Sequence, residues 1–462
     1  MSYEADEHEA EHDTDDFDTD DHDTHDTDEH ETDEHETDEH KLDEPLQRKQ
    51  SALNRIAKMS AFLLFAVLAT ALLFVSAKQE QEPMRNLVYW TGQHQDVPSG
   101  LPEMDYVSHV ALAFMQSSLF NEFDGVKRTE WPLFTTVGQA RARFAPGTKV
   151  LVAIGGWGET AAFSIAARSE QSRKRFARNV AAMVTATDAD GVDIDWEYPG
   201  GNGEDYKQIT NDEKAWEIYA YPLLLAEIRS ALGRDKIISA AVPGKPEDML
   251  AFTRLTVPRI MNSVDFLNVM TYDLMNRRNT VTTHHAGVEN SLAAIDAYIA
   301  AGASPQRLNL GFAYYVKYFK TEHDDCQEMV NQGKAPIGCR TLLMEDPGTG
   351  KDMGRAGAFS WDDAVPSRVK SSYNRAMKEG VYDEVHGGHY YWDSKEDLWW
   401  TFETPLSIAT KKFPLVVMNR RLGGVFAWGV GEDAPLYRHF KTLSHVMELI
   451  RSGEGKALSD EL

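Results

Sequence analysis

Apolar and polar positions along residues 86–428 form short apolar runs separated by longer amphipathic stretches. Runs of strand length recur at residues 86–90, 107–114, 149–154, 191–196, 237–242, 264–270, 308–315 and 424–428. Helical periodicity is clearest at residues 169–186, 215–232, 291–301 and 405–421, which are long enough to connect parallel strands. This pattern predicts an α/β fold. Periodicity alone leaves two architectures open, a (β/α)8 barrel and a doubly wound sheet.

The run at residues 190–197 also carries three carboxylates. On a strand, Asp193, Asp195 and Glu197 share one face, and the apolar residues between them occupy the other. Neighbouring carboxylates in a partly desolvated place cannot all ionise, so one or two keep a proton near neutral pH. Glu197, closest to the C-terminal tip of the strand, is therefore the predicted general acid. The alternatives are a calcium site or a solvated strand edge, but calcium ligands normally come from a loop bent by glycine.

The same run resembles the DxxDxDxE signature of family 18 glycoside hydrolases, the chitinase family. Three further stretches resemble strands of that family in the same order, at residues 153–157 (AIGGW), 270–273 (MTYD) and 423–428 (GGVFAW). The resemblance covers residues 86–450 and implies a (β/α)8 TIM barrel over residues 78–462. Ala153 stands where the family often has serine, so another group is expected to supply that hydrogen bond.

The stretch between the last two predicted strands is too long for one helix. The resemblance implies a small α+β insertion between strands 7 and 8, over residues 319–393, with residues 390–392 leading back into the barrel. The only 2 cysteines, Cys326 and Cys339, lie in this stretch. A disulfide between them would contribute on the order of 3 kcal/mol and indicates an oxidising compartment, while two free thiols are the alternative.

The resemblance also assigns the catalytic roles. In this family the substrate's own N-acetyl group attacks the anomeric carbon, so the substrate must carry an acetamide. Glu197 is then expected to protonate the glycosidic oxygen and later to activate water. Asp195 orients the acetamido group of the −1 sugar, Asp193 exchanges a proton with Asp195, and Tyr272 hydrogen-bonds the acetamido oxygen.

Aromatic residues at strand ends are expected to hold the sugar rings. Trp428 is the predicted floor for the −1 sugar, because it matches the last strand of the family, although a tryptophan at a strand tip otherwise favours core packing. The other predicted substrate-binding residues are Tyr198, Met270, Asp273, Trp157, Gly156, Phe114 and Tyr314. For the aromatic residues Tyr89, Trp90, Phe114 and Tyr314, filling the barrel interior is an equal alternative.

These features predict a chitinase that hydrolyses β-1,4-linked N-acetylglucosamine polymers with retention, acting as a monomer on chitin or chitooligosaccharides. No cofactor, metal or nucleic acid is expected. One alternative is an endo-β-N-acetylglucosaminidase acting on N-glycans, which would share the acid pair. Another is a chitin-binding, lectin-like protein, although Glu197 is present where such proteins usually lack the acid. A third is a surface protein that the barrel only tethers to a cell wall.

Residues 1–58 form a different kind of chain. Residues 1–45 hold 23 Asp and Glu against one Lys, so they carry most of the formal net charge of −26. Such a low-complexity acidic tail is expected to be disordered. Its seven histidines show no ligand spacing that defines a metal site. Without this tail the chain is nearly balanced in charge, so the total charge says little about the substrate.

A hydrophobic segment at residues 59–77 follows the tail, with about 17 uncharged residues at 61–77. Basic residues precede it, which predicts a type II signal anchor with the barrel outside the cell. The sequence Val75-Ser76-Ala77 resembles a cleavage site, so a removed signal peptide is the alternative. Both place the barrel in a secretory or extracellular space. Membrane contact is expected only through residues 61–77, if they are not cleaved.

Overall fold

The computed structural model describes residues 83–122, 128, 130–361 and 365–454. The predicted acidic tail, residues 1–58, and the hydrophobic segment, residues 59–77, lie outside these described residues. Within them, no helix is both long enough and apolar enough to cross a membrane.

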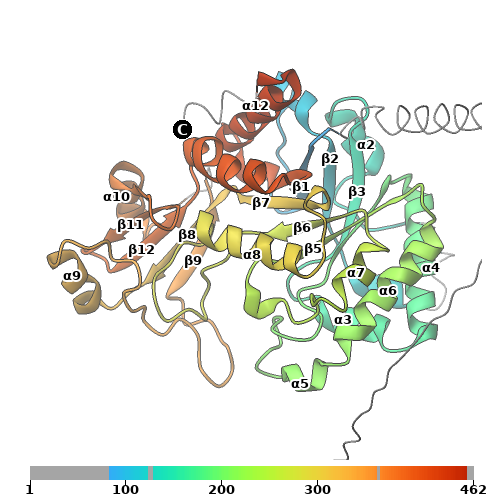
Figure 1. The fold of residues 1–462 in the computed structure, drawn as a ribbon, viewed down its shortest axis with the longest axis horizontal. Helices are drawn as coiled ribbons and strands as arrows, with labels where there is room; N and C mark the ends of the chain where they lie inside the picture. Colours follow the sequence, from blue (N-terminus) through green and yellow to red (C-terminus); the bar gives the residue numbers. More distant parts are fainter. Residues whose placement is uncertain (1–82, 123–127, 129, 362–364, 455–462) are drawn as a thin grey trace, which may run out of the picture. The chain divides into compact units, whose positions relative to one another are not determined.

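Eight parallel strands close into a barrel, which confirms the (β/α)8 prediction and excludes the doubly wound sheet (Figure 1). Around the barrel the order is β1-β13-β7-β6-β5-β4-β3-β2. Pairing of β1 with β13 closes the ring, from Arg85 beside Gly424 to Val88 beside Ala427. The strands are β1 (Arg85–Thr91), β2 (His109–Met115), β3 (Lys149–Gly155), β4 (Gly191–Asp195), β5 (Ile237–Pro243), β6 (Phe266–Met270), β7 (Leu308–Ala313) and β13 (Gly424–Trp428).

Helices surround the barrel and cover its apolar outer face. They are α2 (Val137–Arg143), α3 (Thr160–Ala167), α4 (Glu170–Thr187), α5 (Asn211–Lys214), α6 (Glu217–Leu232), α7 (Val257–Met261), α8 (Val288–Ala300), α11 (Pro405–Ser407) and α12 (Arg438–Ser452). Short 3-10 turns lie at Pro102–Tyr106, Ser117–Asn121, Pro246–Asp248, Pro305–Arg307 and Val430–Asp433. The predicted helix at residues 405–421 is mostly a π-helix, Ile408–Met418, which contains Pro414. Because proline lacks an N–H group, a regular α-helical ladder is interrupted there.

The main core lies between the barrel and these helices. Alternation along β4 turns Val192 and Ile194 outward into this core, and both are fully buried. Trp196 continues that face, where its ring stacks on Phe163 of α3 and its indole N–H donates to Thr160. The opposite face of β4, which carries the carboxylates, is thereby held toward the barrel interior.

An antiparallel sheet of five strands is inserted between β7 and β13, as predicted. Its order is β10 (Val381–Asp383), β11 (Gly388–Asp393), β12 (Leu398–Phe402), β8 (Tyr315–Lys320) and β9 (Ala356–Ser360), with α9 (His323–Asn331) and α10 (Lys370–Glu379) beside it. The sheet extends beyond residues 319–393 on both sides, because β7 runs almost directly into β8. Residues 390–392 lie inside β11 and do not form the return to the barrel. That return follows β12.

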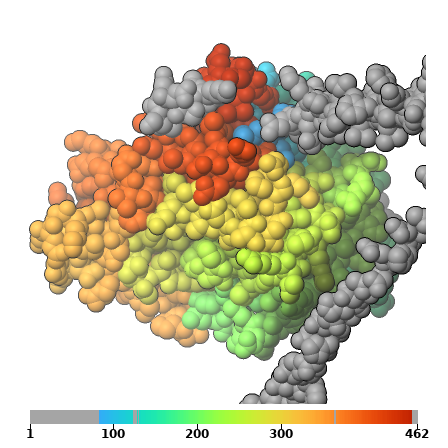
Figure 2. Space-filling view, in the orientation of Figure 1, coloured from blue at the N-terminus to red at the C-terminus, as the bar shows by residue number. Residues whose placement is uncertain are grey.

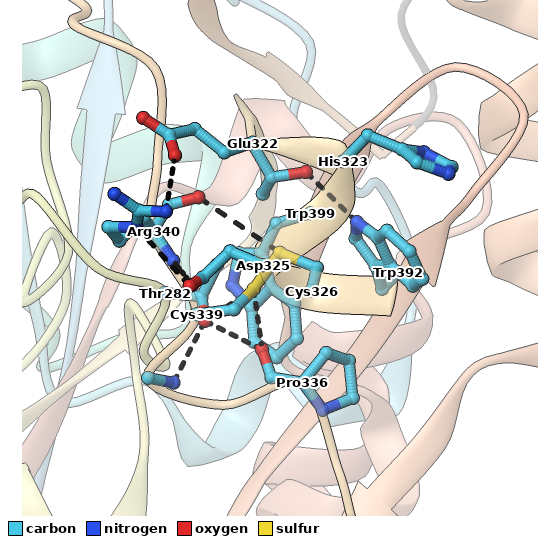
Figure 3. Close-up of a disulfide and its surroundings, with 12 residues drawn as sticks. Thr282, Glu322, His323, Asp325, Cys326, Pro336, Cys339, Arg340, Trp392 and Trp399 are labelled. Atoms are coloured by element: carbon cyan, nitrogen blue, oxygen red, sulfur yellow. Dashed lines mark hydrogen bonds and ion pairs between the residues drawn. A yellow bond between two sulfur atoms is a disulfide. The ribbon is translucent and has the colours of Figure 1, made fainter. Parts of the chain in front are cut away.

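Cys326 of α9 and Cys339 form a disulfide, which confirms the predicted pairing over free thiols (Figure 3). Both cysteines are buried in an apolar cluster with Phe319 and Trp399. Around the bond, Arg340 forms ion pairs with the acidic residues Glu322 and Asp325. The disulfide therefore fastens the α9 side of the insertion to the loop that follows this helix.

Candidate active site

A pocket of about 910 Å³ opens at the C-terminal ends of the barrel strands. Loops after β3, β4, β5 and β6 line one side, and the insertion lines the other. The sequence predicted ten of its lining residues as catalytic or substrate-binding groups or left them open: Asp195, Glu197, Tyr272, Trp428, Tyr198, Met270, Asp273, Trp157, Phe114 and Tyr89.

Asp193 lies below the pocket and is fully buried inside the barrel. It accepts hydrogen bonds from Tyr89 Oη (2.7 Å), Ser239 Oγ (2.6 Å) and Asn268 Nδ2 (3.1 Å). Burial raises its pKa although these three bonds act to lower it. Ala153 is the β3 neighbour of Asp193 and Ser239 is its β5 neighbour. Ser239 therefore supplies, from the opposite side of Asp193, the hydroxyl that is missing at residue 153.

Asp195 and Glu197 occupy the upper part of the acidic row. Asp195 is 2% exposed, and no described residue donates a hydrogen bond to its Oδ1. Burial raises its pKa well above the usual range, and the charges of Glu197 and Asp193 add to this effect. Glu197 is only partly exposed at the pocket wall, and its burial raises its pKa to about 7. Near neutral pH this row therefore holds protons that ordinary carboxylates would have lost.

Tyr272 and Trp428 form the aromatic part of the pocket. Burial raises the pKa of Tyr272 well above its usual range, and the charges of Asp195 and Glu197 add to this, so its hydroxyl remains a donor. The Trp428 ring stacks on Phe114, with 5.5 Å between centroids and 25° between planes, and lies 5.3 Å from the Tyr89 ring. These contacts fix a flat apolar surface beside the carboxylates, which suits the apolar face of a sugar ring.

Asp273 connects the barrel to the insertion. Its Oδ1 accepts from Tyr315 Oη (2.7 Å) and Lys317 Nζ (2.8 Å), both on β8. Burial acts to raise the pKa of Asp273, but the charges of Lys317 and His285 and the hydrogen bonds from Lys317 and Tyr315 together outweigh it, and the pKa is lowered. Asp273 is therefore ionised beside Glu197, and its charge helps to keep the Glu197 proton in place.

Two predicted substrate-binding residues do not line the pocket. Tyr314 is fully buried against His439, with 5.4 Å between ring centroids, so its prediction as a contact residue is corrected. Tyr315 takes the pocket position instead, because successive residues of an extended chain point to opposite sides. Gly156 lies behind Phe114, and a Cβ atom there would come within 2.7 Å of the Phe114 ring. Trp90, for which the sequence left a position in the cleft as one alternative, packs in the core.

Sequence reasoning missed the partners of the acidic row and most of the insertion side. Ser239 and Asn268 are polar residues within otherwise apolar strand runs. That break in the pattern could have indicated side chains that point into the barrel and bond to Asp193. Tyr206, Lys317 and Glu345 gave no such signal, because they lie in segments whose approach to the pocket depends on the tertiary fold.

The described residues contain no group of three or more His, Cys, Asp or Glu side chains arranged to hold a metal ion. Asp193 and Asp195 lie on β4, and Glu197 lies two residues beyond the end of this strand at the pocket wall. The carboxylates, Tyr272 and Trp428 of this pocket can transfer protons, form hydrogen bonds and stack on a flat ring.

A (β/α)8 barrel with carboxylates at the end of its fourth strand, beside an aromatic pocket, places the chain in the class of barrel-type glycoside hydrolases. The family model described as glycosyl hydrolases family 18 matches residues 85–433, and the chain belongs to this family.

Curated relatives include chitinases from fungi. Chitinase 1 of Aphanocladium album is 26% identical over 303 residues, covering 61% of this chain and 60% of the relative. Endochitinase 1 of Metarhizium robertsii is 23% identical over 300 residues, covering 62% of each. The match thus spans about three fifths of the length of these relatives.

Solved structures share the fold. The chitinase RmChi1 from Rhizomucor miehei has a TM-score of 0.60 at 21% identity, covering 78% of this chain and 99% of that one. A class V chitinase mutant from Cycas revoluta, solved in complex with (GlcNAc)3, has a TM-score of 0.56 at 19% identity, with coverages of 78% and 99%. At these identities the likeness concerns the architecture.

Proposed function

We propose that this protein is a chitinase that hydrolyses β-1,4-linked N-acetylglucosamine polymers with retention of configuration. The observation that carries this proposal is the position of Glu197, with a pKa of about 7, beside the buried and unpartnered Oδ1 of Asp195 in an aromatic pocket. A group that carries a proton near neutral pH can act as an acid and then as a base within one cycle. The complexes of similar proteins with (GlcNAc)3 and (GlcNAc)4 support the substrate class.

In the first step, Glu197 donates its proton to the glycosidic oxygen as the bond from that oxygen to the anomeric carbon breaks. The acetamide oxygen of the −1 sugar attacks the same carbon from the opposite face. Asp195 accepts the acetamide N–H, which gives its otherwise unpartnered oxygen a donor. Tyr272 donates from its hydroxyl to the acetamide oxygen and aligns it for the attack.

In the second step, Glu197 is a carboxylate and removes a proton from water on the face vacated by the leaving group. The water oxygen bonds to the anomeric carbon, and the acetamide is released. Two inversions give net retention. Asp193, held by Tyr89, Ser239 and Asn268, shares a proton with Asp195, so Asp195 can carry negative charge while the cyclic intermediate is positive.

The test compares the protein with its Glu197→Gln variant on a soluble N-acetylglucosamine hexamer. We expect turnover to fall by about 10²-fold or more in the variant, because general acid–base catalysis contributes at least that factor. Hexamer binding, measured by calorimetry, should remain within about threefold, because the amide has nearly the same shape. Binding by both proteins with hydrolysis by neither would instead identify a lectin.

We also propose that the barrel works in a secretory or extracellular space. The buried disulfide between Cys326 and Cys339 supports this, because such bonds form and persist in oxidising compartments. N-terminal sequencing of protein recovered from its native location tests whether the hydrophobic segment is removed. A free start near residue 78 would indicate a signal peptide, and an intact segment in the membrane fraction would indicate an anchor.

A further inference from the structure

The two sides of the pocket contact each other through residues that line it. One side is the loop after β4 at residues 202–208, and the other is the insertion loop at residues 345–352. The hydroxyl of Tyr206 donates a hydrogen bond to Oε1 of the buried Glu345. Burial and this carboxylate raise the pKa of Tyr206 to about 12, so the hydroxyl keeps its proton at neutral pH. In Figure 2 the orange surface of the insertion adjoins the green surface of the barrel loops.

A second contact runs beside the first. Arg277, in the segment after β6, forms an ion pair with Asp352 of the insertion loop at 3.1 Å. The tip of that loop also packs against the β4 side, since a Cβ atom on Gly350 would lie 3.0 Å from Cγ of Lys207. Two contacts therefore join the β4 loop to the insertion loop, and a third joins the segment after β6 to the same insertion loop. We call this set the cross-cleft bridge.

Each loop is also held in place by contacts on its own side of the pocket. In the insertion loop, Glu345 and Asp352 pair in antiparallel fashion, and the Asp346 carboxylate accepts from the N–H groups of Gly348 and Thr349. On the barrel side, Arg278 lies over the Tyr206 ring at 3.8 Å.

Arg278 also anchors the β4 loop itself. Its guanidinium donates to the carbonyl oxygens of Asn202 and Gly203, at 3.0 and 3.2 Å. It lies 5.8 Å from the ring of Trp157, which is half exposed in the pocket. Arg278 therefore links the bridge at Tyr206 to the pocket wall at Trp157.

A polymer chain enters a bridged cleft in a different way from an open groove. An internal segment of a long chain enters an open groove sideways, without its ends. Where the two sides are joined, a chain must either stop at the bridge or pass beneath it, and both require that a chain end enters first. The Tyr206 hydroxyl donates to a buried carboxylate, and such a bond is stronger than one between neutral groups. The Arg277–Asp352 ion pair is more exposed and contributes less.

We propose that the cross-cleft bridge makes this enzyme act from chain ends, with Tyr206 and Asp352 as the specificity-determining residues. This inference rests on the proposed chitinase function and adds the mode of attack on the polymer. Opening of the bridge admits internal segments, and closure admits only ends.

The experiment measures the fall in viscosity of a soluble high-mass glycol chitin per reducing end released, with hydrolysis of an N-acetylglucosamine tetramer recorded in parallel. The test variant combines Tyr206→Phe with Asp352→Asn, which removes both polar contacts and keeps the ring on Arg278. We expect its viscosity loss per reducing end to rise roughly tenfold, because loss of a hydrogen bond to a charged group shifts such an equilibrium by about that factor.

The matched control combines Tyr391→Phe with Asp296→Asn. Tyr391 donates to Glu379 within the insertion, and Asp296 of α8 pairs with Arg420, so the same chemical changes fall outside the pocket. The control should behave like the parent protein. Thermal unfolding followed by circular dichroism verifies that both variants are folded.

Three results would overturn the inference. If the parent protein cleaves the tetramer and also lowers viscosity as steeply as random internal cutting requires, the bridge does not restrict access and the chitinase function stands. An unchanged ratio in the folded test variant excludes Tyr206 and Asp352 as determinants. If the parent protein cleaves neither substrate, the proposed function fails and this inference falls with it.

Discussion

Asp193 lies within β4 and Glu197 lies two residues beyond the end of that strand, so their carboxyl groups differ in their surroundings. Asp193 has three donors and no contact with the pocket, whereas Glu197 faces the pocket. Alternation along residues 190–197 predicted one strand face for all three carboxylates, but β4 ends at Asp195 and Glu197 follows it. It did not predict how the two sites differ, because Ser239 and Asn268 come from other strands and approach only in the closed barrel.

The raised pKa of Glu197 leads to a prediction for the pH dependence of kcat/KM. A general acid must carry its proton before reaction, and a pKa of about 7 means that the proton is present below that pH and lost above it. We expect kcat/KM to fall about tenfold per pH unit above an alkaline limb near pH 7. Initial rates on the tetramer between pH 4 and 9 measure this limb. A limb near 4.5, the ordinary value, would contradict the environment described for Glu197.

At the scale of elements, apolar runs located all eight barrel strands, and the chain length between the last two predicted the insertion. The sequence pattern did not show where β7 ends. It therefore predicted Tyr314 as a pocket residue, whereas Tyr315 occupies that position. A one-residue shift moves a side chain to the other face, and no pattern in residues 308–315 marks where β7 ends and β8 begins.

The loop after β3 gives a prediction for Gly156→Ala. Gly156 has a φ of 92°, and its Cβ would meet the Phe114 ring, which stacks on Trp428. We expect a loss of about 1–3 kcal/mol in the free energy of unfolding, together with weaker tetramer binding. The control is Gly158→Ala, where φ is 96° and no atom lies within 4 Å of the added Cβ. Equal effects in both variants would show that backbone strain, and not the Phe114 contact, is responsible.

The disulfide gives a second prediction at this scale. Replacing Cys326 and Cys339 together by serine should lower the free energy of unfolding by about 3 kcal/mol, as expected for a loop of this length. The bond closes a sequence separation of 13 residues. Urea unfolding measures the change, and addition of a reductant to the parent protein should reproduce it. A change below about 1 kcal/mol would mean that the surrounding apolar cluster holds the insertion without the bond.

At the scale of the whole molecule, the chain divides into two units, Met1–Gln81 and Glu82–Leu462. From the sequence, the barrel domain is expected to begin at residue 78, and the four motifs predicted its fold. Periodicity could not predict that the barrel closes. Closure depends on the pairing of β1 with β13, which are the first and last barrel strands in the sequence.

The charge distribution predicts that the N-terminal unit has little influence on catalysis. Residues 1–82 hold 25 Asp and Glu and 6 Lys and Arg, a net charge of −19, so the total of −26 leaves −7 for residues 83–462. An uncharged oligosaccharide experiences little electrostatic steering. We therefore expect protein beginning at residue 83 to hydrolyse the tetramer with a kcat/KM within about twofold of the full chain. A loss of tenfold or more in steady-state assays would assign the N-terminal unit a part in substrate binding.

The central claim is that the substrate's acetamide acts as the nucleophile and Glu197 as the acid and base. The most direct measurement is the anomeric composition of products from a soluble N-acetylglucosamine hexamer, read by proton NMR before mutarotation. We expect the parent protein to release β-anomers first, and we expect no cleavage of a hexamer that carries free amines in place of its acetamides. Initial release of α-anomers, or cleavage of the deacetylated hexamer, would contradict this claim.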